Sequence, residues 1–322
     1  MIPLSSAARL EHAFLVTLVL PLGLVASEAV LAHGFAGKRF FPATLVTDDP
    51  FVADELSLPT ISGSRMSADG DTPATRETDF SVDFSKRLTD TFGIGFGAQY
   101  TQLRPDGADR QSGFGNLAAS LKDQFFTDAE HEAIMSVGLD MDLGGTGSKR
   151  VGAESYSTFT PGIFFGRGFG DLPDEWKFLR PLAVTGQVGI GIPSSASSKT
   201  VGDDGVLSVE QHPNTLQWGF AIEYSLIYLQ SYVKDVGLPE PFNRMIPVIE
   251  IPLTTQLNHG GSGTTGTINP GILWSGQYVQ LSAEASIPIN RASGAGVGWI
   301  VQLHFYLDDL FPNTFGTPLF RN

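Results

Sequence analysis

The chain has 322 residues, no cysteine and a formal net charge of −14. The lack of cysteine excludes a disulfide scaffold and a thiolate metal site. The acidic balance argues against a nucleic-acid partner, which would require a basic surface.

Residues 1–32 have the features of a cleavable signal peptide. Arg9 precedes the apolar stretch "AFLVTLVLPLGLVA", and Val30 and Ala32 stand at the positions that a signal peptidase reads. An uncleaved membrane anchor is the alternative, which the shortness of the apolar stretch disfavours. Cleavage after Ala32 would make His33 the mature N-terminus.

Residues 33–56 form a head segment that neither alternates nor follows a helical period. Its apolar side chains would rarely be left loose, and its cations would find carboxylates to pair with inside a barrel built by the rest of the chain. We therefore expect the head to enter such a barrel from the periplasmic side and to narrow it. The alternative is an arm outside the lumen that docks on a periplasmic partner. The candidate plug residues are Lys38, Arg39, Phe40, Phe41, Asp48 and Asp49.

Residues 57–308 repeat one unit, an alternating segment followed by a turn or a loop. In the first example Phe80, Val82 and Phe84 alternate with polar residues such as Asp79 and Asp83. Strict alternation indicates strands with one apolar and one polar face. About twelve segments follow this pattern, near 57–66, 77–87, 91–103, 113–124, 131–143, 155–168, 178–193, 214–231, 243–258, 265–274, 277–290 and 295–308.

The connections between these segments are alternately compact and long, as in transmembrane barrels with short periplasmic turns and long outer loops. A soluble β-sandwich or barrel is the alternative, but its outer faces would carry charge. Here the apolar face is almost free of charge, and the other face is rich in glycine and small residues. The predicted fold is therefore all-β, a transmembrane antiparallel β-barrel of about 12 strands, with residues 309–322 as a C-terminal tail.

The polar face should point into the lumen, where acids outnumber bases. Such charges either tune selectivity or only solvate the interior and pair with one another and with the head. The lumen-facing candidates are Asp79, Asp83, Lys122, Asp140, Asp142, Gln187, Glu223, Glu250, Glu284 and His304.

Four stretches, "GKRFFPATL", "DDPFVADELSLP", "RVGAE" and "GFGDLPD", carry a resemblance to known proteins. With them the chain resembles a family of uncharacterised outer-membrane transporters related to the barrel family associated with meta-pathway phenol degradation. The resemblance implies a barrel in the bacterial outer membrane and traffic in small aromatic or hydrophobic solutes.

The sequence holds no nucleophile elbow, H-E-x-x-H motif or Walker loop. We therefore expect neither an enzyme nor a metal or cofactor site. The partners that we expect are membrane lipid and a small-molecule solute. The predicted function is passive diffusion of small solutes across the outer membrane. The alternative is a non-conducting structural or surface-interaction barrel that its N-terminal segment plugs.

Overall fold

The computed structural model describes residues 34–320 except 69, 71, 202–206 and 260–262. The predicted signal peptide, residues 1–32, and His33 lie outside this part.

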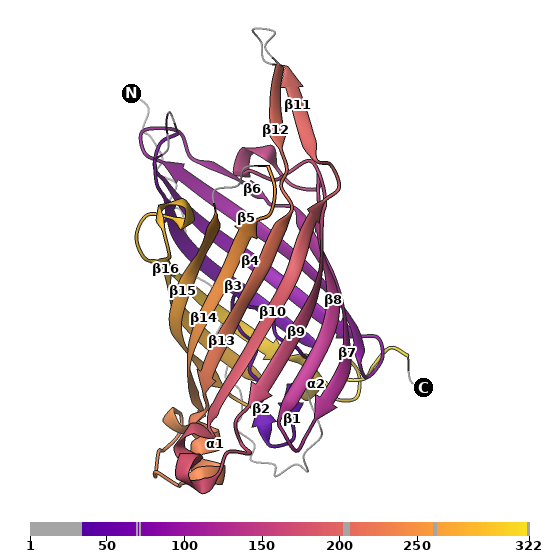
Figure 1. Cartoon of the computed structure of the whole chain (residues 1–322), viewed down its shortest axis with the longest axis vertical. Coiled ribbons are helices and arrows are strands. Elements are labelled where there is room, and N and C mark those ends of the chain that lie inside the picture. Colours follow the sequence, from indigo (N-terminus) through magenta and orange to yellow (C-terminus); the bar gives the residue numbers. More distant parts are fainter. Residues whose placement is uncertain (1–33, 69, 71, 202–206, 260–262, 321–322) are drawn as a thin grey trace, which may run out of the picture. The chain divides into compact units, whose positions relative to one another are not determined.

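One sheet of thirteen described strands closes into an antiparallel barrel (Figure 1). Because β6 (Gln111–Phe114) and β7 pair in succession with β5, the barrel has twelve strand positions, which confirms the predicted fold class and count. The twelve are β3 (Glu55–Met66), β4 (Thr75–Arg87), β5 (Phe92–Pro105), β7 (Leu117–Asp128), β8 (Ala133–Leu143), β9 (Thr158–Gly168), β10 (Leu182–Pro193), β13 (Thr215–Tyr224), β14 (Met245–Gln256), β15 (Thr264–Ser275), β16 (Val279–Pro288) and β17 (Gly298–Tyr306).

The first and last strands, β3 and β17, pair with each other and so close the barrel. Their register places Trp299 opposite Gly63 and His304 opposite Ser57, with an irregularity between these pairs. Gly63 is required at this seam, because a Cβ there would lie 2.6 Å from the indole nitrogen of Trp299. Closure leaves no strand edge exposed to lipid, which a bilayer requires.

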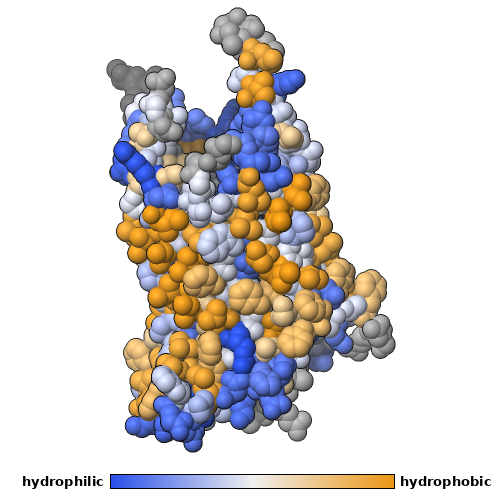
Figure 2. All heavy atoms as spheres, viewed as in Figure 1, coloured by the Kyte–Doolittle hydropathy of each residue, from blue (hydrophilic) through white to orange (hydrophobic). Residues whose placement is uncertain are grey.

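The outer face of the barrel is apolar, as the alternation predicts. Phe96, Ile163 and Leu281 point outward and are 55%, 43% and 51% exposed. Figure 2 shows the apolar side chains gathered over the middle of the strands, with hydrophilic residues towards both ends. This arrangement suits a hydrocarbon layer between two aqueous phases.

Five connections lie at one end of the barrel, which we call the turn end. Three of them are short, at 88–91, 129–132 and 276–278, and two are longer, at 169–181 and 225–244. This end also carries most of the short helices. They are η2 (Asp174–Leu179), α1 (Leu226–Tyr228), η3 (Leu229–Val233), η4 (Phe242–Arg244) and, after the last strand, α2 (Leu307–Leu310). The opposite end, which we call the loop end, carries η1 (Lys149–Val151), η5 (Arg291–Ser293) and a hairpin of β11 (Ser197–Val201) and β12 (Leu207–Gln211). No helix within the described residues is long and apolar enough to span a membrane.

One predicted strand, 214–231, is too long. β13 ends at Tyr224, because the hydroxyl of Ser225 accepts a hydrogen bond from the backbone N–H of Tyr228 and starts α1. Such a cap favours a helical turn over further extension of the strand.

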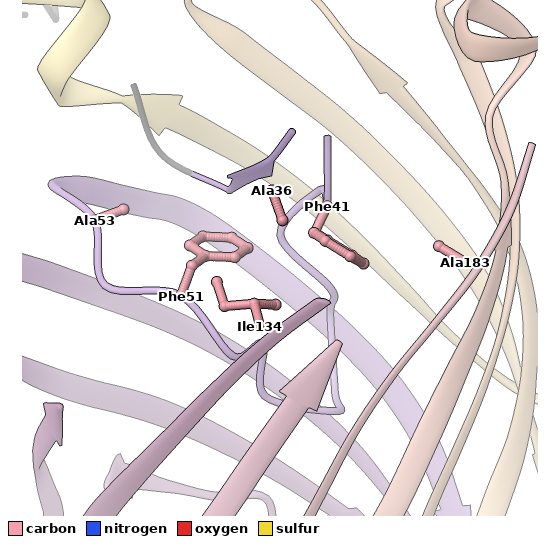
Figure 3. Packing of buried hydrophobic residues seen from close by; sticks show 6 residues of the cluster. All are labelled: Ala36, Phe41, Phe51, Ala53, Ile134 and Ala183. Atoms are coloured by element: carbon pink, nitrogen blue, oxygen red, sulfur yellow. The ribbon is translucent and has the colours of Figure 1, made fainter. Parts of the chain in front are cut away.

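The head segment packs at the turn end, where β1 (Phe35–Ala36) and β2 (Arg39–Phe40) form a small hairpin (Figure 1). Phe41 and Phe51 of the head are buried with Ile134 of β8, and Ala183 of β10 belongs to the same cluster (Figure 3). The polar-inside pattern therefore does not extend to the turn end, where the head packs against apolar side chains of the wall.

Candidate functional site

A cavity of about 800 Å³ lies inside the barrel. At one end it is lined by loop-end residues such as Asn116 and Glu154, and at the other by residues 43–49 of the head. Within the described part of the chain its lining contains several carboxylates but no lysine or arginine. The cavity therefore extends from the loop end of the barrel to the head and is lined by carboxyl groups.

Four of the predicted lumen residues line this cavity, namely Asp83, Asp140, Asp142 and His304. The carboxylate of Asp142 accepts a hydrogen bond from the side-chain amide of Asn116 at 2.8 Å.

Asp79 lies on β4, as Asp83 does, and is nearer the loop end of that strand. Its carboxylate accepts hydrogen bonds from the hydroxyl of Thr101, at 2.6 Å, and from that of Ser62, at 3.3 Å. These contacts hold the carboxylate within the sheet.

Two other predicted lumen residues bind the head. The ammonium of Lys122 lies 2.9 Å from the carboxylate of Asp48 and donates to the carbonyl of Asp49 at 2.7 Å. The side-chain oxygen of Gln187 accepts a hydrogen bond from the backbone N–H of Asp48 at 3.1 Å. The structure thus brings the predicted plug residues Asp48 and Asp49 together with predicted wall residues.

Glu250 is completely buried and makes three hydrogen bonds to the head. Its carboxylate accepts hydrogen bonds from the backbone N–H groups of Leu45, Val46 and Thr47 at 2.6, 2.9 and 2.6 Å. Three backbone N–H donors of the head thus converge on one carboxylate. Residues 45–47 of the head are therefore held against β14 by one side chain.

Glu223 is buried on β13, which pairs with β14, and Glu284 is buried on β16, which is separated from β14 by β15. Glu223 accepts a 3.4 Å hydrogen bond from the hydroxyl of Thr185. Glu284 lies near Glu250 and Asn269 and does not contact a cation among the described residues.

The remaining plug candidates lie at the turn end. Arg39 is 1% exposed and donates to the carboxylate of Glu132 at 3.2 Å, while its guanidinium lies 3.9 Å from the ring centroid of Tyr228. Arg39 therefore pairs with a turn residue instead of a predicted lumen carboxylate. Lys38 is exposed, and its ammonium lies 5.5 Å from the ring centroid of Tyr232.

Two aromatic plug candidates are packed against the barrel. Phe41 is completely buried in the cluster with Ile134, and the ring of Phe40 contacts the ring of Tyr306 edge-on, with 6.1 Å between centroids.

Tyr228 completes the contact around Arg39. Its hydroxyl donates to the Glu132 carboxylate at 2.7 Å. Burial, together with this hydrogen bond and the charge of Glu132, raises the pKa of Tyr228 well above its ordinary value. The phenol thus remains protonated and keeps its donor on the carboxylate.

The end of the head is tied to the barrel by Asp54, which is completely buried. Its carboxylate contacts the ammonium of Lys86 at 2.8 Å and the guanidinium of Arg87 at 3.0 Å. The same two cations donate to carbonyls of the C-terminal tail, at Phe315 and Gly316 among others. Residues 315–320 of the tail therefore lie against the end of β4.

Four residues that contact the head were not expected from the sequence, namely Glu132, Tyr228, Lys86 and Arg87. The alternating pattern marks residues within strands, whereas Glu132 and Tyr228 lie in connections at the turn end. Lys86 and Arg87 do lie on β4, and the excess of carboxylates in the head was the available signal for them.

A closed barrel with an apolar outer face and a polar cavity is a transmembrane β-barrel in contact with lipid. Among the described residues, no group of three or more His, Asp or Glu is arranged to hold a metal ion.

Solved structures with a similar fold include an outer-membrane channel from Pseudomonas putida F1, with a TM-score of 0.53 and 11% identity over 79% of this chain and 94% of that chain. The NanC porin matches with a TM-score of 0.43 and 9% identity over 77% of this chain and 98% of that one. The translocator domain of the autotransporter NalP from Neisseria meningitidis matches with a TM-score of 0.47 and 9% identity, over 79% and 88%.

No family model matches the chain, and neither does any curated protein. At these identities the likeness concerns the fold alone. The fold is that of bacterial outer-membrane channels, which agrees with the predicted location.

Proposed function

We propose that this chain is a passive diffusion channel for small solutes in the bacterial outer membrane. The observation that carries the proposal is the polar cavity of about 800 Å³ inside a closed twelve-stranded barrel. Barrels of eight strands leave little room inside and those of sixteen leave a water-filled channel, so an intermediate lumen suits small molecules. The resemblance in sequence extends the proposal to aromatic or hydrophobic solutes, and that part stays a prediction.

In this proposal the head is the constriction of the channel. Its residues 43–49 line the inner end of the cavity, and the loop end faces the outside of the cell as in other outer-membrane barrels. A solute would enter from the loop end and pass between the head and the wall on its way to the periplasm.

The second candidate is a non-conducting barrel that the head plugs permanently. The observation that favours it is the number of contacts that hold the head, including three backbone N–H groups on Glu250 and the buried Arg39–Glu132 pair. A segment tied at so many points costs free energy to displace.

Single-channel recording in a planar bilayer separates the two candidates. The test compares the intact protein with a variant lacking residues 34–53, which keeps Asp54 on Lys86 and Arg87. A channel conducts when intact and conducts more without the head, whereas a plugged barrel conducts only without it. Equal currents from both proteins, with both barrels folded, would place the head outside the conduction path.

A further inference from the structure

One wall of the cavity, near the head, combines side chains from the two strands that close the barrel. Glu55 and Ser57 belong to β3, and Gln302 and His304 belong to β17. His304 lies opposite Ser57 in the register, and the Ser57 hydroxyl and His304 Nδ1 are 2.9 Å apart. His304 Nε2 lies 3.6 Å from Oε2 of Glu55.

Two acceptor oxygens on this wall have no hydrogen-bond partner within the described residues, Oε1 of Glu55 and Oε1 of Gln302. Both residues are 8% exposed, and both line the cavity. Buried polar atoms almost always have a partner, and an unpartnered one calls for a specific explanation. Both atoms can only accept, so a group that binds to them must carry hydrogen-bond donors. Nε2 of His304, which also has no hydrogen-bond partner among the described residues, faces the other oxygen of Glu55.

The charge around this wall points to the sign of that group. No lysine or arginine among the described residues lines the cavity, and Lys122 behind it is already in contact with Asp48 and Asp49 of the head. Burial raises the pKa of Asp49 well above its ordinary value; Lys122 opposes this, and the carboxylates of Asp48 and Glu55 add to it. Glu55, Asp48 and Asp49 are therefore close enough to interact electrostatically, and no lysine or arginine among the described residues of the cavity lining balances them.

We propose that this wall binds the N–H donors of a small organic cation, an ammonium or guanidinium compound, and that the cavity selects such solutes over anions. The volume of about 800 Å³ falls within the range of small-molecule sites. Selection by a negatively charged lumen follows from the field that its carboxylates create. The inference rests on the proposed function in one respect, namely that the cavity is the route of the solute.

Calorimetric titration of the purified protein in detergent tests the site without requiring conduction. The probes are propylammonium and propionate, which are similar in size and opposite in charge, at equal ionic strength. We expect propylammonium to bind and propionate not to bind. Binding of neither probe, or of both with equal affinity, overturns the proposal.

Three variants locate the binding. Glu55→Gln removes one lumen charge with little change of shape, and we expect propylammonium to bind about tenfold more weakly, the effect of losing one charged hydrogen bond. Gln302→Glu adds a carboxylate to the same wall and should tighten binding. Glu240→Gln removes an exposed carboxylate at the turn end, outside the lumen, and should leave binding unchanged. Unchanged affinity in a folded Glu55→Gln protein overturns the assignment.

Reversal potentials in a planar bilayer with a KCl gradient separate this inference from the proposed function. Current that is selective for potassium over chloride supports both. Current without cation preference keeps the channel and refutes the selectivity. If no current flows while propylammonium binds, the channel is refuted and the cation site stands.

Discussion

Replacing Glu250 by alanine should release the head from the barrel wall without unfolding the barrel. The Glu250 carboxylate is the acceptor for the backbone N–H groups of Leu45, Val46 and Thr47. The backbone of residue 250 pairs with Ala221 and Asn269 in the sheet, and the substitution leaves this pairing intact.

The size of the effect follows from the three hydrogen bonds. A hydrogen bond to a charged group contributes about 1.5–3 kcal/mol. Bonds that share one carboxylate do not add fully, so the total is smaller than the sum of three such contributions. We therefore expect docking of the head to weaken by about 2–4 kcal/mol.

Amide hydrogen exchange at residues 45–47 measures this change. A loss of 2–4 kcal/mol in local stability corresponds to roughly 30- to 1000-fold faster exchange. Glu240→Ala, which removes an exposed carboxylate paired with Arg244, is the matched control and should leave these amides unchanged. Equal protection of these amides in Glu250→Ala and in the intact protein would refute the reasoning. The comparison requires that both barrels are folded, which a denaturing gel shows when the unboiled protein migrates faster than the boiled protein.

Three further substitutions test other parts of the structure. Leu281→Arg places a charge on the lipid-facing side of β16 and should destabilise the barrel by about 2–4 kcal/mol, measured by folding into lipid vesicles; an unchanged free energy would mean that the face is wrongly assigned. Arg39→Met leaves Glu132 buried without its cation, which should cost about 3–5 kcal/mol and expose the head to a protease; resistance equal to that of the intact protein contradicts this. Gly37 has a φ of 61°, and a Cβ there would lie 2.0 Å from the Ala129 carbonyl oxygen, so Gly37→Ala should also loosen the head in the same assay.

The strands and their faces could be predicted because the membrane imposes a strict rule on them. Asp83, Asp140 and His304 line the cavity, and Leu281 points outward. A lipid-facing position tolerates few polar residues, so every second residue carries information about facing.

The turn end could not be predicted in this way, because it is packed like the core of a soluble protein. Ile134, Ile246 and Val248 point inward, although they are apolar, since the head covers them. Alternation shows which residues share a face and does not show what packs against that face. The pairing of Arg39 with Glu132 joins positions 93 residues apart, which no local pattern reveals.

The contacts of Asp54 have a consequence for the order of assembly. Asp54 directly precedes β3, its carboxylate holds Lys86 and Arg87 of β4, and its carbonyl accepts a hydrogen bond from the N–H of Leu307, just after β17. The first and last strands of a barrel are the most distant in sequence, so their meeting carries the largest loop-closure entropy and comes late in folding. Since Asp54 joins both of them, the end of the head is seated in the same event that closes the barrel. A chain whose head is misplaced lacks the hydrogen bond from Leu307, which adds to the backbone pairing of β3 with β17.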